Sequence, residues 1–233
     1  MQVIPSIDLE AGRSRVVFWP GAATGVGAPT DRPERIIERL VEQGARLLHL
    51  VDFDGARAGS PANLEAVGAI ASRTAVPLQL AGGLDSPEAI QLAFAAGATR
   101  VVLTTAIADR PDDLRACLAV AGDWLAVGLD PRPERLAAFP WRRAAPPSPD
   151  ALVAELVGAG VTRLVLAHGG TDPDLARVRS IVRSYDAEVL VAGGVRDLDG
   201  LRRLRDTGVA GVILGEALLS GAIDLSTALE TAA

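Results

Sequence analysis

Cysteine, aromatic residues and long apolar runs are scarce in this sequence. The only cysteine, Cys117, cannot form an internal disulfide, which favours a reduced, cytosolic setting, and we expect it to be a buried filler of a helix. No stretch reaches the roughly 18 uninterrupted apolar residues of a membrane-spanning helix. The first residues, MQVIPSIDLE, lack the basic segment and apolar run of a secretory signal. We therefore expect a cytosolic chain that does not associate with membranes.

Basic tracts and cofactor motifs are also missing. The formal net charge is −6 and no run of like charge occurs, which argues against binding to nucleic acid. The sequence has no cysteine–histidine cluster with zinc spacing, no phosphate-binding loop of the P-loop type and no dinucleotide-binding fingerprint. We expect neither a metal nor a nucleotide cofactor.

Apolar residues make up 49% of the 233 residues, enough for a substantial core, and they gather in short runs. Because aromatic residues are only 3%, Ala, Val and Leu must fill that core. Hydrophobicity that runs on instead of alternating is typical of strands buried on both faces, as in a parallel sheet. The eight predicted strands are residues 3–7, 46–53, 77–81, 100–104, 124–130, 163–167, 188–192 and 210–215.

Amphipathic segments with helix signals separate these runs. Ser86-Pro87-Glu88 and Arg110-Pro111-Asp112 place proline near a first helical position, and glycines such as Gly97 and Gly208 follow helix ends. A repeated strand–helix order implies right-handed crossovers and a parallel sheet. Eight such units close into a barrel, so the predicted fold class is α/β, a single (β/α)8 TIM barrel domain over residues 1–233.

The chain repeats itself in halves, roughly 1–122 and 123–233. AGGL at 81–84 matches AGGV at 192–195, and the next apolar run in each half matches at the same offset. Because these matches keep one order, we predict two duplicated half-barrels of four units each. Chance similarity among segments rich in Ala, Gly and Val is the alternative.

Glycines at the ends of the seventh and eighth strands indicate a phosphate site. The segments VAGGV and ILGEA let backbone N–H groups approach an anion closely, and a helix that begins after the second would add its positive end. A phosphate grip by the loops after these two strands recurs in this fold. The residues predicted to bind phosphate in this half are Gly193, Gly194, Arg196, Gly215 and Glu216. The alternative is that the glycines only make tight turns.

The first half carries a poorer version of this grip. Thr104 stands where the second half has Gly215, and Asp85 stands where it has Arg196. Thr104 still offers an N–H and a hydroxyl, but Asp85 would repel an anion unless it points away. We expect a second, weaker phosphate site here, made by Gly82, Gly83, Thr104 and Thr105.

An aspartate ends the first strand of each half. Asp8 and Asp130 lie on strands that face each other across the barrel, and such a pair can act as general base and general acid if their environments push their pKa values apart. The alternative is that each aspartate caps the next helix. His168, at the end of the sixth strand, is a third candidate catalyst because the ordinary pKa of histidine lies near neutrality. In contrast, we expect His49 to be a core histidine and Asp52 to orient loops.

Two long loops follow the first and fifth strands, at 20–31 and 131–150. Loops at the carboxyl ends of barrel strands carry function, so we expect active-site loops, and a disordered insertion is the alternative. Trp141 in the second loop, and Trp19 just before the first, have little core to fill and are predicted to stack on a planar part of a substrate.

Together these elements resemble the HisA/HisF family of histidine-biosynthesis barrels over nearly the whole chain. The segments IPSIDLEAGR (4–13), LHLVDFDGA (48–56) and VAGGVRDLDGLRRL (191–204) carry the resemblance, which is closer to HisA than to HisF. It implies an Amadori rearrangement, in which an aminoaldose phosphate attached to an aminoimidazole carboxamide ribotide becomes the aminoketose. It also implies that Asp8 is the general base and that Asp130 is the general acid that opens the sugar ring. Trp141 matches the tryptophan of the family's fifth loop. We expect a phosphorylated sugar or ribotide substrate, no glutaminase partner and a monomer.

Three departures from the family pattern leave the substrate open. The family's Thr-Asp pair after the sixth strand reads Ala167-His168, its GGGIR after the third strand reads AGGLD, and its LGTA after the fourth reads LTTA. A bisphosphate substrate needs both grips. We predict a divergent aldose–ketose isomerase of this family. The alternatives are a paralogue that acts on a different, monophosphorylated substrate and a barrel that binds a phosphorylated ligand without turning it over.

Overall fold

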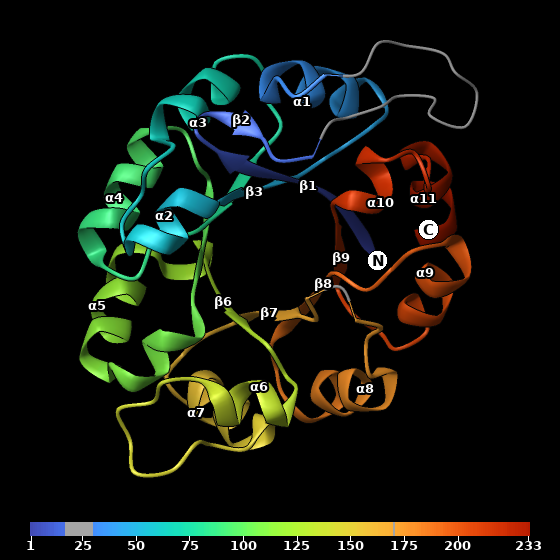
Figure 1. The fold of residues 1–233 in the computed structure, drawn as a ribbon. Helices are drawn as coiled ribbons and strands as arrows, with labels where there is room; N and C mark the ends of the chain where they lie inside the picture. The colour runs from blue at the N-terminus through green and yellow to red at the C-terminus, as the bar shows by residue number, and fades with distance from the viewer. Residues whose placement is uncertain (17–29, 170) are drawn as a thin grey trace.

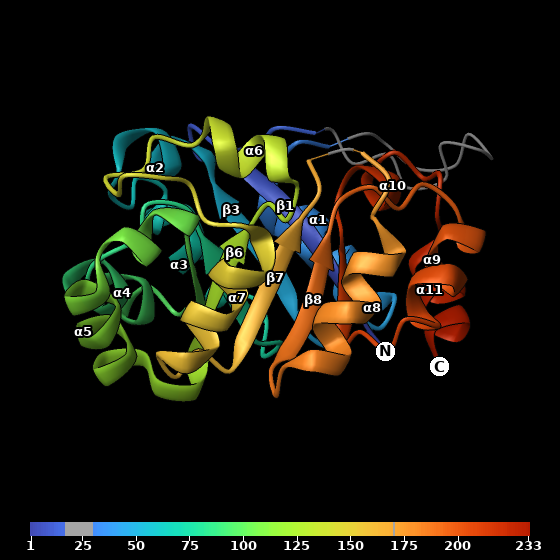
Figure 2. The same ribbon diagram turned by 90° about the horizontal axis from the view of Figure 1, so that it is seen from below.

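Eight parallel strands close into a barrel in the computed structural model, which describes residues 1–16, 30–169 and 171–233. The strands are β1 (Gln2–Glu10), β3 (Leu48–Asp52), β4 (Leu78–Ala81), β5 (Arg100–Leu103), β6 (Leu125–Leu129), β7 (Arg163–Ala167), β8 (Glu188–Ala192) and β9 (Gly211–Leu214). Each pairs with the next along the chain, and β1 pairs with β9, Ile4 opposite Ile213, to close the circle. Figure 1 looks along the barrel and Figure 2 across it. The predicted (β/α)8 barrel is confirmed.

Helices follow the strands and surround the barrel (Figure 1). They are α1 (Pro33–Glu42), α2 (Phe53–Ala58), α3 (Leu64–Ala71), α4 (Pro87–Ala95), α5 (Pro111–Ala121), α6 (Pro133–Ala138), α7 (Pro149–Gly158), α8 (Leu175–Ser184), α9 (Leu198–Arg205), α10 (Glu216–Leu219) and α11 (Leu225–Ala232), with 3-10 turns η1 (Thr105–Asp109) and η2 (Gly122–Trp124). Side chains of Ser86, Ser148 and Asp197 accept hydrogen bonds from first-turn N–H groups, which fixes where α4, α7 and α9 begin. Within the described ranges, no helix is long and apolar enough to cross a membrane.

A short antiparallel strand that the sequence did not indicate, β2 (Arg13–Ser14), pairs with the end of β1. The turn between the two strands is held from outside, because the Ala11 N–H donates to Asp54 Oδ2 at 2.7 Å and the Gly12 N–H donates to Asn63 Oδ1 at 2.8 Å. Trp19 and positions 20–29 of the predicted first loop lie outside the described residues.

Side chains alternate along each strand between the barrel interior and the helix layer. The interior cluster consists of Ile4, Leu47, Val102, Ala126, Val165, Leu190 and Ile213. The larger cluster lies between strands and helices and includes Cys117, which is fully buried. Burial raises the pKa of the Cys117 thiol to about 11, so it stays protonated at neutral pH. The prediction that Cys117 is a buried filler is confirmed.

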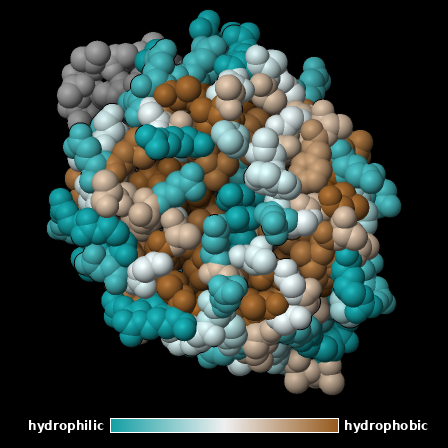
Figure 3. Space-filling view, turned by 180° about the vertical axis from the view of Figure 1, so that it is seen from behind, coloured by the Kyte–Doolittle hydropathy of each residue, from teal (hydrophilic) through white to brown (hydrophobic). Residues whose placement is uncertain are grey.

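Polar groups run from the middle of the barrel toward the strand starts. His49 Nδ1 and Gln79 Nε2 are 2.9 Å apart, and Arg100 Nη1 donates to Gln79 Oε1 at 3.1 Å. His49 is thus buried and partnered, as predicted. Figure 3 shows the face of the molecule at which the strands begin, and hydrophobic and hydrophilic residues are interspersed over it.

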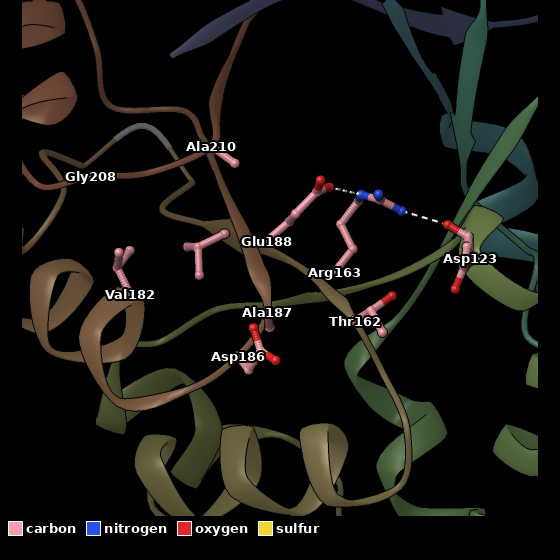
Figure 4. A pocket seen from close by; sticks show the side chains of 10 residues that line it. Asp123, Thr162, Arg163, Val182, Asp186, Ala187, Glu188, Gly208 and Ala210 are labelled. Atoms are coloured by element: carbon pink, nitrogen blue, oxygen red, sulfur yellow. Dashed lines mark hydrogen bonds and ion pairs between the residues drawn. The ribbon is translucent and has the colours of Figure 1, made fainter.

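A hollow of about 580 Å³ is lined by residues at the starts of β7 and β8 (Figure 4). Its Arg163 lies between two acceptors: Nε is 2.5 Å from Glu188 Oε2, and Nη1 donates to the Asp123 carbonyl at 2.7 Å. This cation is already paired, so the hollow offers little to a phosphate. A phosphate site is instead expected at the opposite end of the barrel, where the carboxyl ends of the strands lie.

Candidate active site

A cavity of about 550 Å³ opens at the carboxyl ends of β1, β3, β7, β8 and β9. Active sites of this fold lie at this end of the strands. The cavity brings Asp8 together with all five residues of the predicted second-half phosphate grip, Gly193, Gly194, Arg196, Gly215 and Glu216. Its lining also includes Ser6, His49, Val51 and Phe53 from β1, β3 and the start of α2.

Asp8 faces the barrel interior, in the same register as Ile4 of the interior cluster. Burial raises the pKa of the Asp8 carboxyl, and the positive charge of Arg15 opposes that rise. A carboxylate with a raised pKa is a stronger base than an ordinary aspartate. The position and the electrostatics of Asp8 therefore suit a general base.

Asp130 follows β6 in the register of Ala126, which also belongs to the interior cluster. Its Oδ1 accepts hydrogen bonds from the backbone N–H of Arg132 at 3.1 Å and from Arg132 Nε at 2.8 Å. Arg132 Nη2 contacts the other oxygen, and Arg135 Nε lies 3.5 Å from it. Burial by itself would raise the pKa of Asp130, but these hydrogen bonds and charges outweigh it and hold the pKa below its ordinary value. The pKa values of Asp8 and Asp130 are thus pushed in opposite directions.

Arg132 was not singled out in the sequence, yet it holds the Asp130 side chain in place; neither residue lines the cavity at Asp8. Besides binding Asp130, its Nη1 donates to Thr171 Oγ1 at 3.1 Å, which joins the loop after β6 to the loop after β7. The signal in the sequence was Asp130-Pro131-Arg132, in which an arginine two residues after the candidate catalyst can reach back to it.

His168 lies behind the cavity wall. Ala167 and Gly169 line the cavity, whereas His168 continues the register of Leu166 toward the helix layer and is 1% exposed. Burial lowers the pKa of His168, and within the described residues its Nε2 has no hydrogen-bond partner. The catalytic role predicted for His168 remains untested, and this position does not favour it.

The second-half grip is built from backbone. Gly193 and Gly194 have φ values of 80° and 79°, and a side chain at Gly194 would put its Cβ 2.1 Å from the Thr171 carbonyl oxygen. At Gly215 there is room, because an added Cβ would come no closer than 3.7 Å to Ser6. The helix that follows, α10, is a single turn, so individual N–H groups and Arg196 would hold an anion here with little help from a helix dipole.

The first-half residues are arranged differently. Asp85 does not point away, because its Oδ1 accepts the Thr104 backbone N–H at 2.8 Å and its Oδ2 accepts the Thr104 hydroxyl at 2.5 Å. The Thr105 hydroxyl donates to the Gly128 carbonyl at 3.0 Å. Of the four residues predicted to form this grip, Gly82, Gly83, Thr104 and Thr105, none lines the cavity.

Asp52 supports the site, as expected. It is fully buried, and its carboxylate accepts the Gly55 and Ala62 N–H groups at 2.7 Å each and the Asn63 side-chain amide at 2.7 Å. These bonds fix the loop after β3. An added Cβ at Gly82 would lie 2.1 Å from the Asp52 carbonyl oxygen, so this loop is packed tightly against the first-half glycines.

Trp141 lies against its own loop. Its indole N–H donates to the Leu136 carbonyl at 2.6 Å, its ring lies 4.7 Å from that of Phe139, and the Arg143 guanidinium lies 5.0 Å from its centre. It does not line the cavity at Asp8, and its stacking on a substrate stays a prediction. Among the described residues, no three His, Cys, Asp or Glu side chains gather so as to hold a metal ion.

Comparison with known proteins places the chain among relatives of the same length. The family model described as "Histidine biosynthesis protein" matches residues 2–224. An isomerase of Roseiflexus castenholzii, named 1-(5-phosphoribosyl)-5-((5-phosphoribosylamino)methylideneamino) imidazole-4-carboxamide isomerase, is 39% identical over 98% of this chain and 98% of its own. Isomerases of the same name from Moorella thermoacetica and Chloroflexus aurantiacus are 36% and 31% identical over 100% of this chain and 99% and 98% of theirs. The predicted family is confirmed: the chain belongs to the histidine-biosynthesis protein family.

Proposed function

We propose that this protein is an aldose–ketose isomerase that carries out the Amadori rearrangement of histidine biosynthesis, the reaction class to which its similarly sized relatives point. The observation that carries the proposal is the cavity itself, where Asp8 shares one space with the glycine-lined ends of β8 and β9. A phosphate held at those glycines would place the attached sugar beside the carboxylate.

The chemistry needs one proton donor and one proton acceptor. Asp130 gives a proton to the ring oxygen of the aminoaldose while the nitrogen lone pair displaces that oxygen from carbon 1. Asp8 then takes the proton from carbon 2, and the electron pair forms the enaminol. Asp8 returns its proton to carbon 1, and the hydroxyl proton on carbon 2 passes to Asp130, which gives the aminoketose and restores both carboxyl groups to their starting forms.

The acid role sets a condition on Arg132. With Arg132 bound, Asp130 is held in its ionised form, and an ionised carboxylate has no proton to give. The proposal therefore requires that Arg132 leave Asp130 when substrate enters, and the substrate's own negative charge can draw it away. Hydrogen bonds of a catalytic group in a ligand-free site often rearrange in this way.

We also propose that the enzyme works as a cytosolic monomer without a glutaminase subunit. The resemblance to the isomerase branch of the family supports this, since the isomerisation uses no ammonia. Light scattering of the purified protein tests the monomer.

The test of function is turnover of the relatives' aminoaldose substrate by the purified protein, compared with Asp8→Asn and Asp130→Asn. Loss of a general base or acid lowers kcat by about 10²- to 10⁴-fold, and we expect losses of that order in both variants. Asp199→Asn on α9 makes the same chemical change at a side chain that is 75% exposed, and it should leave kcat unchanged. A folded protein without turnover, or full activity in Asp8→Asn, would refute the proposal.

A further inference from the structure

The two halves place matched segments at matched strand ends, but only the second-half segments line the cavity at Asp8. Gly193, Gly194 and Gly215, after β8 and β9, all line the cavity, and Arg196 lies beside them. The corresponding first-half positions are Gly82, Gly83, Thr104 and Asp85, after β4 and β5, and none of these lines it. If the halves at 1–122 and 123–233 are duplicates, as we propose, then one copy of the grip has been closed.

Asp85 is the residue that closes it. Its carboxylate accepts the backbone N–H of Thr104 at 2.8 Å and the hydroxyl of Thr104 at 2.5 Å. The guanidinium of Arg110 completes the surroundings, with Nη2 3.4 Å from Asp85 Oδ2 and Nη1 donating to the Asp85 carbonyl at 3.3 Å. A backbone N–H, a hydroxyl and an arginine facing one anion are the partners that a bound phosphate would have.

The pairing is also sheltered from water. The Asp85 and Arg110 side chains are 20% and 26% exposed, whereas the second-half pair, Arg196 and Asp172, is 69% and 76% exposed. A carboxylate held in place by three groups in a sheltered site is displaced by a phosphate only at the cost of breaking all three contacts. Arg196, the arginine of the second half, is by contrast largely exposed to solvent.

We infer that Asp85 occupies the first-half anion position with its own carboxylate, so that this barrel grips a single phosphate group, at Gly193, Gly194, Arg196 and Gly215. The inference rests on the proposed function and narrows its substrate class to aminoaldoses recognised through one phosphate end. Asp85 then determines specificity without touching the reacting atoms. On this inference, the second, weaker phosphate site expected from the sequence would not bind phosphate, and the titration below tests that prediction.

The number of phosphate groups bound per chain tests this directly. In calorimetric titration with ribose 5-phosphate, the unmodified protein should bind one equivalent, and Arg196→Ala should weaken that binding by about tenfold or more. Asp85→Ser removes the internal carboxylate but leaves the Thr104 N–H and Arg110 in place, so a second equivalent should appear. Asp113→Asn is the matched control. Asp113 contacts the same arginine at 3.2 Å but lies outside the grip, and this variant should still bind one equivalent.

The unmodified protein provides a test that does not depend on any variant's folding. Its affinity for the relatives' substrate, whose name contains two phosphoribosyl groups, should exceed that for a single-phosphate fragment by less than about tenfold. Two equivalents of ribose 5-phosphate bound to the unmodified chain, or a single equivalent that survives Arg196→Ala but is lost in Asp85→Ser, would overturn the inference. Because these are binding measurements, an absence of turnover would refute the proposed function and leave the phosphate count standing.

Discussion

Arg132 donates from its Nε to Oδ1 of Asp130 at 2.8 Å, and its backbone N–H donates to the same oxygen at 3.1 Å. The two side chains are 21% and 24% exposed, so water screens the pair only in part. The arrangement keeps the proposed acid in its ionised form until something competes for the guanidinium. In the proposed mechanism, Arg132 would therefore connect substrate binding to the protonation state of Asp130.

Replacing Arg132 should shift the pH profile of the reaction. In Arg132→Met the pKa of Asp130 should rise, because burial is then opposed only by the backbone N–H of residue 132 and by the charge of Arg135. A general acid with a higher pKa stays protonated to higher pH, so the alkaline limb of the kcat/KM profile should move upward in pH. The measurement is kcat/KM from about pH 3 upward for the variant and the unmodified enzyme, because the pKa of Asp130 in the unmodified enzyme lies below its ordinary value of 3.8.

Arg135→Met is the matched control for that experiment. Arg135 lies 3.5 Å from the other oxygen of Asp130, but its side chain is 64% exposed. The same loss of charge should therefore shift the profile much less. An alkaline limb that stays in place in Arg132→Met would show that Asp130 does not supply the proton.

Replacing Asp8 or Asp130 by the neutral residue asparagine should change the stability of the protein in opposite directions. The folded pKa of Asp8 is raised, so its ionised form costs stability above its ordinary pKa of 3.8, and Asp8→Asn should raise the thermal midpoint at pH 7. The folded pKa of Asp130 is lowered, so its ionised form adds stability above 3.8, and Asp130→Asn should lower the midpoint at pH 7. Both differences should shrink toward pH 3. Thermal unfolding at the two pH values checks this, and a fall in midpoint for Asp8→Asn would contradict the burial argument.

Sequence patterns were sufficient to predict the barrel. Seven of the eight apolar runs contain or equal the observed strands, for example 163–167 for β7, and the first, 3–7, lies inside β1. Asp8 and Asp130 were predicted as catalysts because the repeat puts them at equivalent strand ends, and a parallel barrel brings such ends to one face. The glycines of the second-half grip were predicted in the same way, and the structure places them in the lining of the cavity at Asp8.

The orientation of His168 and the contacts of Asp85 could not be predicted from these patterns. A strand buried on both faces shows no alternation of hydrophobicity, so nothing in RLVLAH indicates which side His168 takes. The contact between Asp85 and Thr104 joins loops 19 residues apart, and it depends on backbone geometry that the order of residues does not reveal. The sequence showed that Asp85 stands where the second half has Arg196. It did not show that the Asp85 carboxylate turns toward Thr104.

Alanine substitutions at Gly194 and Gly215 should have different effects. The first should lower the stability of the protein, and the second should weaken phosphate binding. Gly194→Ala forces a side chain into a positive φ of 79° and within 2.1 Å of the Thr171 carbonyl oxygen, so we expect a loss of stability of about 2 kcal/mol or more. Gly215→Ala meets only ordinary contacts, at 3.7 Å, and should change stability by no more than about 0.5 kcal/mol. Because Gly215 lines the cavity, its added methyl group would lie at the proposed phosphate position. Urea unfolding together with ribose 5-phosphate titration should show a stable Gly215→Ala that binds at least about tenfold more weakly, and unchanged binding would exclude Gly215 from the grip.

Stability should also fall as the solution is acidified from pH 7 to pH 5, and His49 should account for most of the fall. Burial, with a smaller contribution from the charge of Arg100, lowers the pKa of His49 from 6.5 to about 4. The unfolded chain therefore binds a proton before the folded chain does, so the stabilising effect is complete above pH 6.5 and is lost as the pH falls toward 4. Over that whole window the loss amounts to at most about 3 kcal/mol.

His49→Gln should flatten this dependence, since glutamine can keep a hydrogen bond to Gln79 without taking up a proton. His168, the only other histidine of the chain, also has a lowered pKa, so His168→Gln serves as the comparison variant. Urea unfolding at pH 7, 6 and 5 would give the slope for each protein. A slope that is unchanged in His49→Gln would mean that His49 takes up its proton while the chain stays folded, and that the pair with Gln79 does not exclude the charged form from the barrel.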